Sequence, residues 1–276
     1  MRLRLTSAAN AGIICNIGDL SIWCDVLHNV RVQGFSTLTK ERLEQLIKSD
    51  GFTPPSLLFY THCRHFDHYS ESLNKEFLER YPYTLAAAPR RLRETDIVIS
   101  GESQRMKLRD VSLEFIRLTH EGEQFKEIPH YGCMISHGGE QILMVGDCKL
   151  CSDELRDYVR DKHTDVLIAP FSWITLAKGR EFIDTYIKPK HIIVNHLPLE
   201  ADDLYGYREA AVRCAGKVKA TQVHICMEML QEVTIEYEQY NLLSGDIKHR
   251  PGLQSRFRGD SFAAPDGGLI PYPVAE

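Results

Sequence analysis

The segment YTHCRHFDHYS, residues 60–70, places three histidines and one aspartate within the seven positions from His62 to His68. It follows the apolar run SLLF directly, and such a run indicates a buried strand. Imidazole and carboxylate groups together suit zinc, manganese or iron, whereas calcium takes oxygen ligands. The segment therefore predicts a transition-metal site at the end of a strand, with His62, His65, Asp67 and His68 as candidate ligands.

Three further ligand-type residues each follow an apolar run. His120 comes after LEFIRLT, Asp147 after QILMVG and His196 after HIIVN. If these strands run the same way, their ends meet at one edge of a sheet and their side chains converge. The tight spacing of aspartate and histidine allows two metals that share one carboxylate, and such a pair activates water as a nucleophile at neutral pH.

Short strands and amphipathic helices alternate along the chain. A meander of three strands is followed by a helix over 36–52, the strand before His62 and a helix over 71–82. A second block of strands and helices follows from residue 84. The order predicts an α/β fold in which two sheets face each other with helices outside, built from two similar halves within one domain, residues 1–240. Residues 241–276 are rich in proline, glycine and polar residues, and we expect a C-terminal tail or surface arm.

Composition narrows the class of protein. The chain has 276 residues and a formal net charge of −5. It has no basic excess that would indicate nucleic-acid binding, and no apolar run of membrane-spanning length. The eight cysteines are spread over apolar, strand-like segments, which predicts buried reduced thiols rather than a disulfide scaffold. We expect a cytoplasmic protein that acts on a small molecule; a homo-oligomer is compatible with the sequence.

Order and spacing of five segments resemble the metallo-β-lactamase-fold metal-dependent hydrolases, over residues 1 to about 235. The resemblance implies a four-layer αβ/βα sandwich, with two mixed sheets flanked by helices and the metals at one edge between the sheets. The segments are NAGIICNIGDLSIWCDVLHN with its strand-end Asp25, THCRHFDH at 61–68, THEG at 119–122, VGDC at 145–148 and VNHLP at 194–198.

The resemblance also implies roles for single residues and a cofactor of two divalent ions, zinc first, with manganese or iron as alternatives. Asp67 would also act in catalysis, by orienting the nucleophile or passing a proton to the leaving group. Asp25 would accept an N–H from a ligand histidine and hold its tautomer. The implied ligands are His62, His65 and His120 for the first metal, Asp67, His68 and His196 for the second, and Asp147 as the bridge.

Two assignments stay open. The family motif places its first two histidines two residues apart, and here His65, Asp67 and His68 keep the usual mutual spacing, which puts Cys63 in the first position. Either Cys63 binds the metal, or one residue is inserted near Arg64 and His62 takes that place. A loop absorbs one residue at modest cost, whereas a thiolate changes charge and metal softness, so we favour His62.

The second open assignment concerns the third histidine. His130 also lies near a strand, YGCMIS, but it precedes that strand and follows a proline. His120 closes a strand, and we therefore favour His120 as the ligand, with His130 facing substrate or supporting a ligand. Around the metals, the loops near residues 28–40, 121–131 and 171–180, together with the C-terminal tail, are expected to bind substrate. Candidates for an apolar wall are Phe35, Phe125, Tyr131, Phe171 and Trp173.

The same resemblance implies a binuclear hydrolase, similar to the lactonase-like and uncharacterised members of the superfamily. A metal-bound hydroxide would attack an ester, lactone, amide or phosphoester. Two alternatives belong to other classes: a di-iron redox protein of the same fold, and a metal-binding or sensor protein without catalysis.

Overall fold

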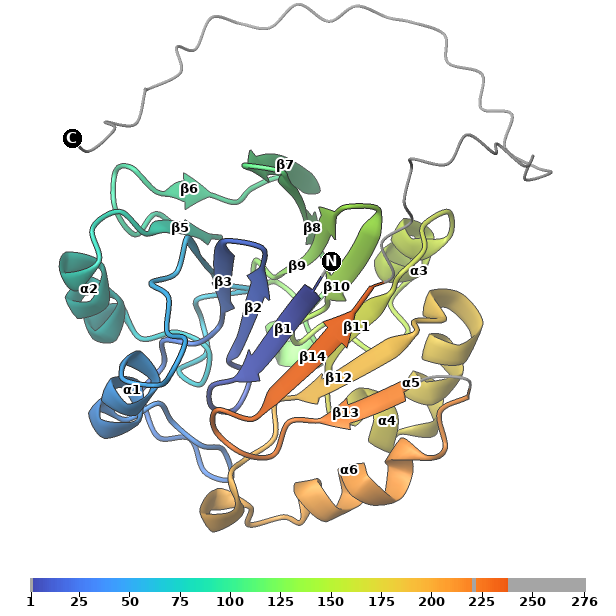
Figure 1. Cartoon of the computed structure of the whole chain (residues 1–276). Helices are drawn as coiled ribbons and strands as arrows, with labels where there is room; N and C mark the ends of the chain where they lie inside the picture. The colour runs from blue at the N-terminus through green and yellow to red at the C-terminus, as the bar shows by residue number, and fades with distance from the viewer. Residues whose placement is uncertain (1, 220–221, 238–276) are drawn as a thin grey trace, which may run out of the picture. The chain divides into compact units, whose positions relative to one another are not determined.

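The computed structural model describes residues 2–219 and 222–237 (Figure 1). Within this part of the chain the strands form two seven-stranded sheets, with the order β14-β1-β2-β3-β4-β5-β6 in the first and β13-β12-β11-β10-β9-β8-β7 in the second. Both sheets contain parallel and antiparallel pairs. The expected architecture of two mixed sheets flanked by helices is confirmed.

The bounds of the elements follow. The first sheet comprises β1 Arg2–Ser7, β2 Ile13–Ile17, β3 Leu20–Cys24, β4 Leu57–Phe59, β5 Leu85–Ala88, β6 Ile97–Val98 and β14 Glu232–Glu236. The second comprises β7 Ser103–Leu108, β8 Val111–Arg117, β9 Tyr131–His137, β10 Glu140–Met144, β11 Val166–Pro170, β12 His191–Asn195 and β13 Gln222–Ile225. The α-helices are α1 Lys40–Ile47, α2 Glu71–Arg80, α3 Asp153–Val159, α4 Ser172–Thr175, α5 Ala177–Phe182 and α6 Tyr207–Ala215. Shorter helical turns are η1 Glu123–Phe125, η2 Ile183–Ile187 and η3 Glu200–Asp202.

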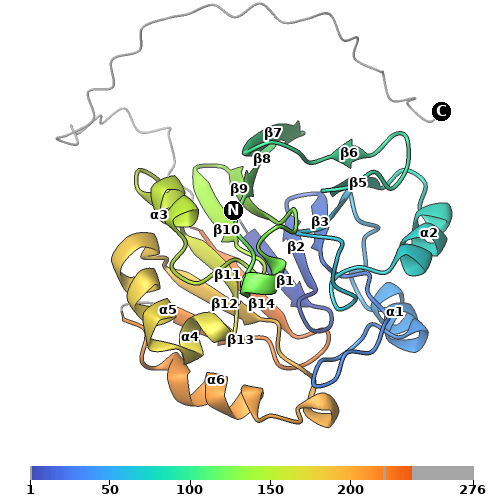
Figure 2. The ribbon, with the colours of Figure 1, turned by 180° about the vertical axis from the view of Figure 1, so that it is seen from behind.

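The elements of residues 2–237 form four layers. Helices α1 and α2 lie beside the first sheet, and α3 to α6 lie beside the second (Figures 1 and 2). The sheets bury a shared apolar layer between them, in which the rings of Phe59 and Phe115 lie 5.1 Å apart. A second apolar layer, around Trp23, lies between the first sheet and its helices. A third, around Trp173, lies between the second sheet and its helices.

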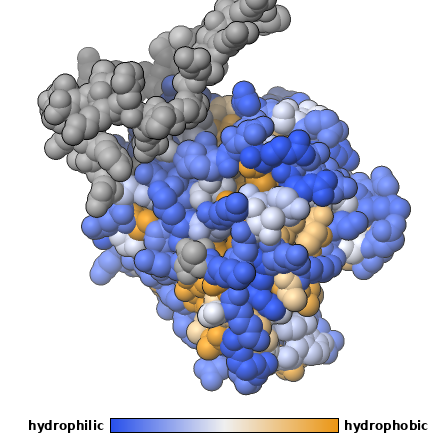
Figure 3. Space-filling view, turned by 90° about the vertical axis from the view of Figure 1, so that its right-hand side faces the viewer, coloured by the Kyte–Doolittle hydropathy of each residue, from blue (hydrophilic) through white to orange (hydrophobic). Residues whose placement is uncertain are grey.

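Strands buried on both faces explain the continuous apolar runs in the sequence. In β11 the side chains of Val166 and Ile168 face the layer between the sheets, while Leu167 and Ala169 face the helices. Both sets are buried, so the strand has no polar face. On the side of the molecule that faces right in Figure 1, the surface is mostly hydrophilic. Figure 3 shows small clusters of hydrophobic residues among the hydrophilic ones there.

Among the described strands, each sheet has three antiparallel pairs followed by three parallel pairs, as expected of two similar halves, but the boundary between the halves lies later in the chain than we expected. β5 and β6, from the second block of the sequence, complete the first sheet, and β14 returns to pair with β1. β7 was not expected from the sequence, because its residues SQRMKL are largely polar and alternate between exposed and half-buried at a sheet edge. The predicted tail, residues 241–276, lies outside the described residues.

Strand directions explain which loops meet. β10, β11 and β12 are parallel, and β8 runs the same way because β9 is antiparallel to both of its neighbours. The ends of β8, β10 and β12 therefore lie at one edge of the second sheet, together with the start of β9. Among the described residues, none of the helices is both long and apolar enough to cross a membrane.

Candidate metal centre

The loops after β4, β8, β10 and β12 bring two groups of ligand-type side chains together. Within each group, one possible ligand atom from each residue lies within 4.8 Å of those of the others. The first group is His62, His65, His120 and Asp147, and the second is Asp67, His68 and His196. The structure thus brings together all seven residues that the sequence nominated as metal ligands.

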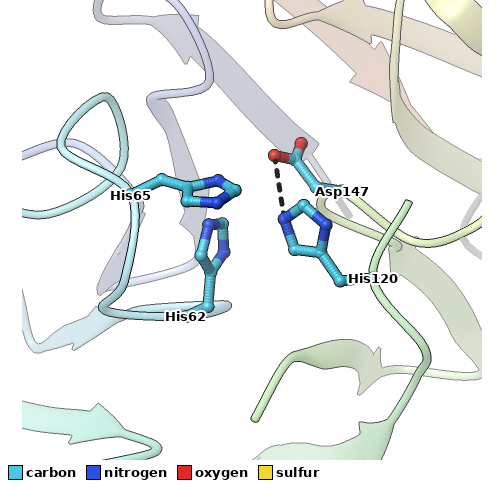
Figure 4. Close-up of side chains that lie close together, drawn as sticks. All are labelled: His62, His65, His120 and Asp147. Carbon is cyan, nitrogen blue, oxygen red and sulfur yellow. Dashed lines mark ion pairs between the residues drawn. The ribbon is translucent and has the colours of Figure 1, made fainter. Parts of the chain in front are cut away.

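In the first group the three imidazole rings point toward one another and toward the Asp147 carboxylate (Figure 4). Ring centroids are 4.8 Å apart for His62 and His65, 5.0 Å for His62 and His120, and 4.7 Å for His65 and His120. Oδ2 of Asp147 lies 3.6 Å from Nε2 of His120. All four residues are buried or half-buried, so the group is shielded from bulk water.

Hydrogen bonds hold the tautomers of two of these histidines. The Thr61 hydroxyl donates to Oδ2 of Asp25 at 2.7 Å, so it accepts from Nδ1–H of His62 at 3.0 Å. Nδ1–H of His120 donates to the Glu121 carbonyl at 2.6 Å. In both rings Nε2 is therefore the nitrogen that keeps a lone pair.

These lone pairs have no hydrogen-bond partner within the described protein. The Nε2 atoms of His62, His65 and His120 are buried and accept or donate no hydrogen bond. A buried polar atom left without a partner costs about 1–3 kcal/mol, so three converging ones indicate a ligand that the protein itself does not supply. A divalent transition-metal cation fits this donor set of imidazoles and a carboxylate.

The second group is equally compact. Nε2 of His68 lies 3.1 Å from Nε2 of His196, which in turn lies 3.6 Å from Oδ2 of Asp67. Nδ1–H of His68 donates to Asp25, so Nε2 is the nitrogen that faces the group. Two ligands of a tetrahedral zinc ion, each about 2.0–2.1 Å from the metal, lie about 3.4 Å apart. The observed spacing of the second group therefore also fits a metal ion.

Asp147 lies between the two groups. Its Oδ2 is 3.1 Å from Nε2 of His68, and its Oδ1 is 3.5 Å from Nε2 of His196, in addition to the contact with His120. Burial alone would raise the pKa of Asp147, but His68 and His196 outweigh it and hold that pKa well below its usual value. Asp147 thus stays an anion at neutral pH, with one carboxylate contacting histidines of both groups.

Burial lowers the pKa of a histidine, and neighbouring charges add to that effect at His62 but oppose it at His68. Burial lowers the pKa of His62 well below its usual value, and the neighbouring His68 adds to this effect. Burial would also lower the pKa of His68, but the carboxylates of Asp147 and Asp25 together raise it well above its usual value. The neutral form of His62 is the form that binds metals.

Asp25 belongs to neither ligand group, but its hydrogen bonds orient residues of both. Its carboxylate accepts from the Thr61 amide at 2.9 Å, from the Thr61 hydroxyl, and from Nδ1–H of His68 at 3.0 Å. The residue is buried and adopts a left-handed conformation, φ 50°, directly after β3. A non-glycine residue in this region carries strain that the surrounding contacts must compensate, and such residues cluster at functional sites.

Asn10 is a further site residue, which the sequence analysis did not nominate. Its Nδ2 donates to the backbone carbonyl of Asp67 at 3.2 Å and to Oδ2 of Asp67 at 3.3 Å. The backbone carbonyl of Asn10 accepts from the backbone amide of His196 at 2.9 Å. Asn10 and His196 both have positive φ, 49° and 57°. Asparagine tolerates this conformation, and that tolerance in the turn before β2 is the one local signal that could have identified it.

Cys63 lies away from both groups. Its side chain packs against the apolar layer between the first sheet and its helices, together with Tyr60 and Tyr69. Burial raises the pKa of the Cys63 thiol to about 12, so the thiol stays protonated at neutral pH. The extra residue is accommodated in the bends at 63–65, and His62 reaches the first group.

We expect His62→Ala to weaken metal binding at least about tenfold, because it removes an imidazole whose lone pair faces the group. Cys63→Ala should change metal affinity less than about twofold, because it removes only packing. Competition titrations with a zinc-sensitive dye would measure both. A larger loss for Cys63→Ala than for His62→Ala would show that the thiol is the ligand.

His130 is close to the first group but is not part of it. Its ring centroid lies 5.4 Å from that of His120, and its Nδ1–H donates to the carbonyl of Leu118. Burial lowers the pKa of His130 to about 3. A Cβ at Gly146, which has φ 53°, would come within 2.7 Å of Nε2 of His130, so this ring packs against the backbone just before Asp147. His130 is therefore placed to support the loop that carries Asp147.

Two of the five aromatic residues expected around the metals contact ligand histidines. Phe125 lies edge-on to His65 with ring centroids 4.4 Å apart, and Phe35 lies edge-on to His196 at 4.9 Å. The expectation is wrong for Tyr131 and Trp173, which are buried in the apolar layers on either side of the second sheet. Phe171 is half-buried and packs on Tyr207.

No protein-family model and no curated protein sequence match this chain. Solved structures do match it in fold. A metallo hydrolase from the hyperthermophilic archaeon Ignicoccus hospitalis, Igni18, superposes with a TM-score of 0.61 at 16% identity, covering 86% of this chain and 100% of the other. The metallo-β-lactamase fold protein YhfI from Bacillus subtilis gives 0.58 at 13% identity, covering 84% and 99%.

A third match is CmlA, a diiron β-hydroxylase from Streptomyces venezuelae, with a TM-score of 0.59 and 14% identity. The match covers 85% of this chain and 54% of CmlA, which is therefore a longer protein. A metallo hydrolase and a hydroxylase thus share the fold of this chain. The chain has the metallo-β-lactamase fold.

Proposed function

We propose that this protein is a metal-dependent hydrolase with two divalent cations, held by His62, His65 and His120 on one side and by Asp67, His68 and His196 on the other, with Asp147 shared. The observation that carries the proposal is the set of three buried Nε2 atoms without hydrogen-bond partners, which converge beside a carboxylate that also contacts the second group. The fold match to Igni18, a metallo hydrolase, supports the reaction class.

When bound, divalent cations lower the pKa of a coordinated water and stabilise negative charge that develops on the substrate. The protein's own groups complete the chemistry. Asp67 is buried apart from 12% of its side chain, and Asn10 holds its carboxylate toward His196. From there Asp67 accepts a proton from the nucleophile or passes one to the leaving group. Phe35 and Phe125 exclude water from the histidines that they cover.

The substrate class that fits is a small molecule with an ester, lactone, amide or phosphoester bond. Zinc is our first choice of metal, and the mixed imidazole and carboxylate donors also suit manganese or iron. We further propose a cytoplasmic location. All eight cysteines are free thiols, five of them buried, which suits a reducing compartment.

The likeness to CmlA makes a di-iron redox protein the second candidate. The absorption spectrum of protein purified without added metal separates the two candidates, because a di-iron centre absorbs in the visible or near-ultraviolet range and a di-zinc centre does not. Elemental analysis of the same sample distinguishes both from a protein that holds no metal.

We expect about two equivalents of transition metal per chain, from the two ligand groups. Elemental analysis before and after dialysis against a chelator would measure this, and hydrolysis of a panel of lactones, thioesters and phosphodiesters should disappear and return with the metal. Less than about half an equivalent after zinc and manganese have been supplied would contradict the proposed centre.

A further inference from the structure

A cavity of about 430 Å³ lies beside the second ligand group. Its walls come from the loop after β3 and from the segment around η3, and they include Arg31, Val32, Phe35, Asp202 and Leu204. Phe35 belongs to both the cavity and the metal centre, because its ring lies edge-on to that of His196. A molecule in the cavity would therefore extend to within one side chain of His196.

Hydrogen bonds hold the two segments that form this cavity together. The Ser36 hydroxyl donates to Oδ2 of Asp202 at 2.7 Å and accepts from the amide of Leu199 at 2.8 Å. Phe35 also stacks on Tyr207, with ring centroids 6.0 Å apart. Contacts between two separate segments therefore hold the wall next to the metal centre in place.

Among the described residues, the cavity wall contains one cation, Arg31, and one acid, Asp202. Asp202, the acid in its wall, is already engaged by Ser36 and lies 3.9 Å from the guanidinium of Arg42. Arg31 is exposed, and within the described residues it forms neither an ion pair nor a side-chain hydrogen bond. The free cation of Arg31 therefore lies beside apolar side chains, among them Leu204, which is 62% exposed.

We propose that this cavity binds the carboxylate-bearing part of the substrate, with Arg31 pairing with the carboxylate and Val32, Phe35 and Leu204 contacting the adjoining hydrocarbon. The guanidinium fork matches a carboxylate in two parallel hydrogen bonds, and one cation balances one carboxylate better than a phosphate with about −1.5 to −2 charges. This inference rests on the proposed function, since it places the scissile bond at the metal centre, and it narrows the substrate to anionic, partly apolar esters, lactones or amides.

The first test measures binding without catalysis. Calorimetric titrations of metal-free full-length protein with 4-phenylbutyrate and with its neutral amide should show at least about tenfold tighter binding of the carboxylate, as a charge-assisted hydrogen bond predicts. Arg31→Ala should remove that preference, and Arg31→Lys should keep part of it. Lys107→Ala, at an exposed cation of β7 on the far edge of the second sheet from β12, is the matched control and should leave the preference unchanged.

The second test uses the zinc-loaded protein with 4-nitrophenyl hemisuccinate and 4-nitrophenyl acetate. Arg31→Ala should lower kcat/KM for the anionic ester about tenfold and leave the neutral ester within about twofold. Two results would overturn the assignment of Arg31. One is a ratio of kcat/KM for the two esters that Arg31→Ala leaves unchanged. The other is a preference for the carboxylate over the amide that persists in metal-free Arg31→Ala protein. Carboxylate binding without hydrolysis of either ester would instead count against the proposed function alone, and tighter binding of phenyl phosphate than of 4-phenylbutyrate would replace the carboxylate by a phosphate.

Discussion

Asp147→Asn is expected to lower the rate of hydrolysis at least about 100-fold, equivalent to about 2.7 kcal/mol in the barrier. The carboxylate contacts His120 in the first ligand group and both His68 and His196 in the second, so its charge serves both metals. Asparagine keeps the volume and removes the charge. Without it, the Nε2 atoms of His68 and His196 would still converge, but with no shared anion to hold a second cation beside the first.

The measurement combines elemental analysis of metal content with kcat/KM at saturating zinc. Circular dichroism and thermal unfolding should show a retained fold, because Asp147 lies at the sheet edge and is absent from the apolar layers. Asp161→Asn, at an exposed aspartate after α3, is the matched control and should leave both quantities unchanged. An Asp147→Asn variant that keeps more than about a tenth of the wild-type rate would remove Asp147 from the metal centre.

Asp25→Asn is expected to lower metal affinity about 10- to 100-fold although this residue belongs to neither ligand group. Its carboxylate orients His68 directly and orients His62 through the Thr61 hydroxyl. An amide offers one acceptor oxygen to three donors and places an NH₂ group against at least one of them. Unfolding free energy should also fall, by about 1–3 kcal/mol, because a buried donor loses its partner.

Asparagine is the informative substitution here because it tolerates the left-handed backbone that Asp25 adopts, so the variant changes charge without adding strain. Asp19→Asn, in the exposed turn between β2 and β3, provides the control. Competition titration and denaturant unfolding would give the two quantities separately. A variant with lower stability and unchanged metal affinity would assign Asp25 to the fold rather than to the ligands.

Much of the architecture could be predicted because the sequence encodes it locally. The run VLIAP is apolar at every position and HIIVN at its three central positions, which indicates strands covered on both faces, and polar residues follow them at the points where the strands end. The assignment of strands to sheets could not be predicted in this way. β14 pairs with β1 across more than 220 residues of sequence, and neither strand carries a local signal that specifies its partner.

The site shows the same division at the level of single residues. The spacing of His62, His65, Asp67 and His68 is visible in the sequence, together with the extra residue among them. Which side chain turns away was decided by packing, since Cys63 fits the apolar layer that also holds Tyr60 and Tyr69. A choice between neighbours in one loop depends on what surrounds that loop in space, and periodicity carries no information on that.

The sequence by itself determined the donor chemistry and the class of fold, because residue type and strand-end position are local properties. Only the tertiary structure decided which atoms converge. Asn10 links Asp67 to His196, and Thr61 links Asp25 to His62, through hydrogen bonds between loops that lie far apart in the chain. The physical reason is that a hydrogen bond requires two groups within about 3 Å, and for distant segments only the packing of the two sheets sets that distance.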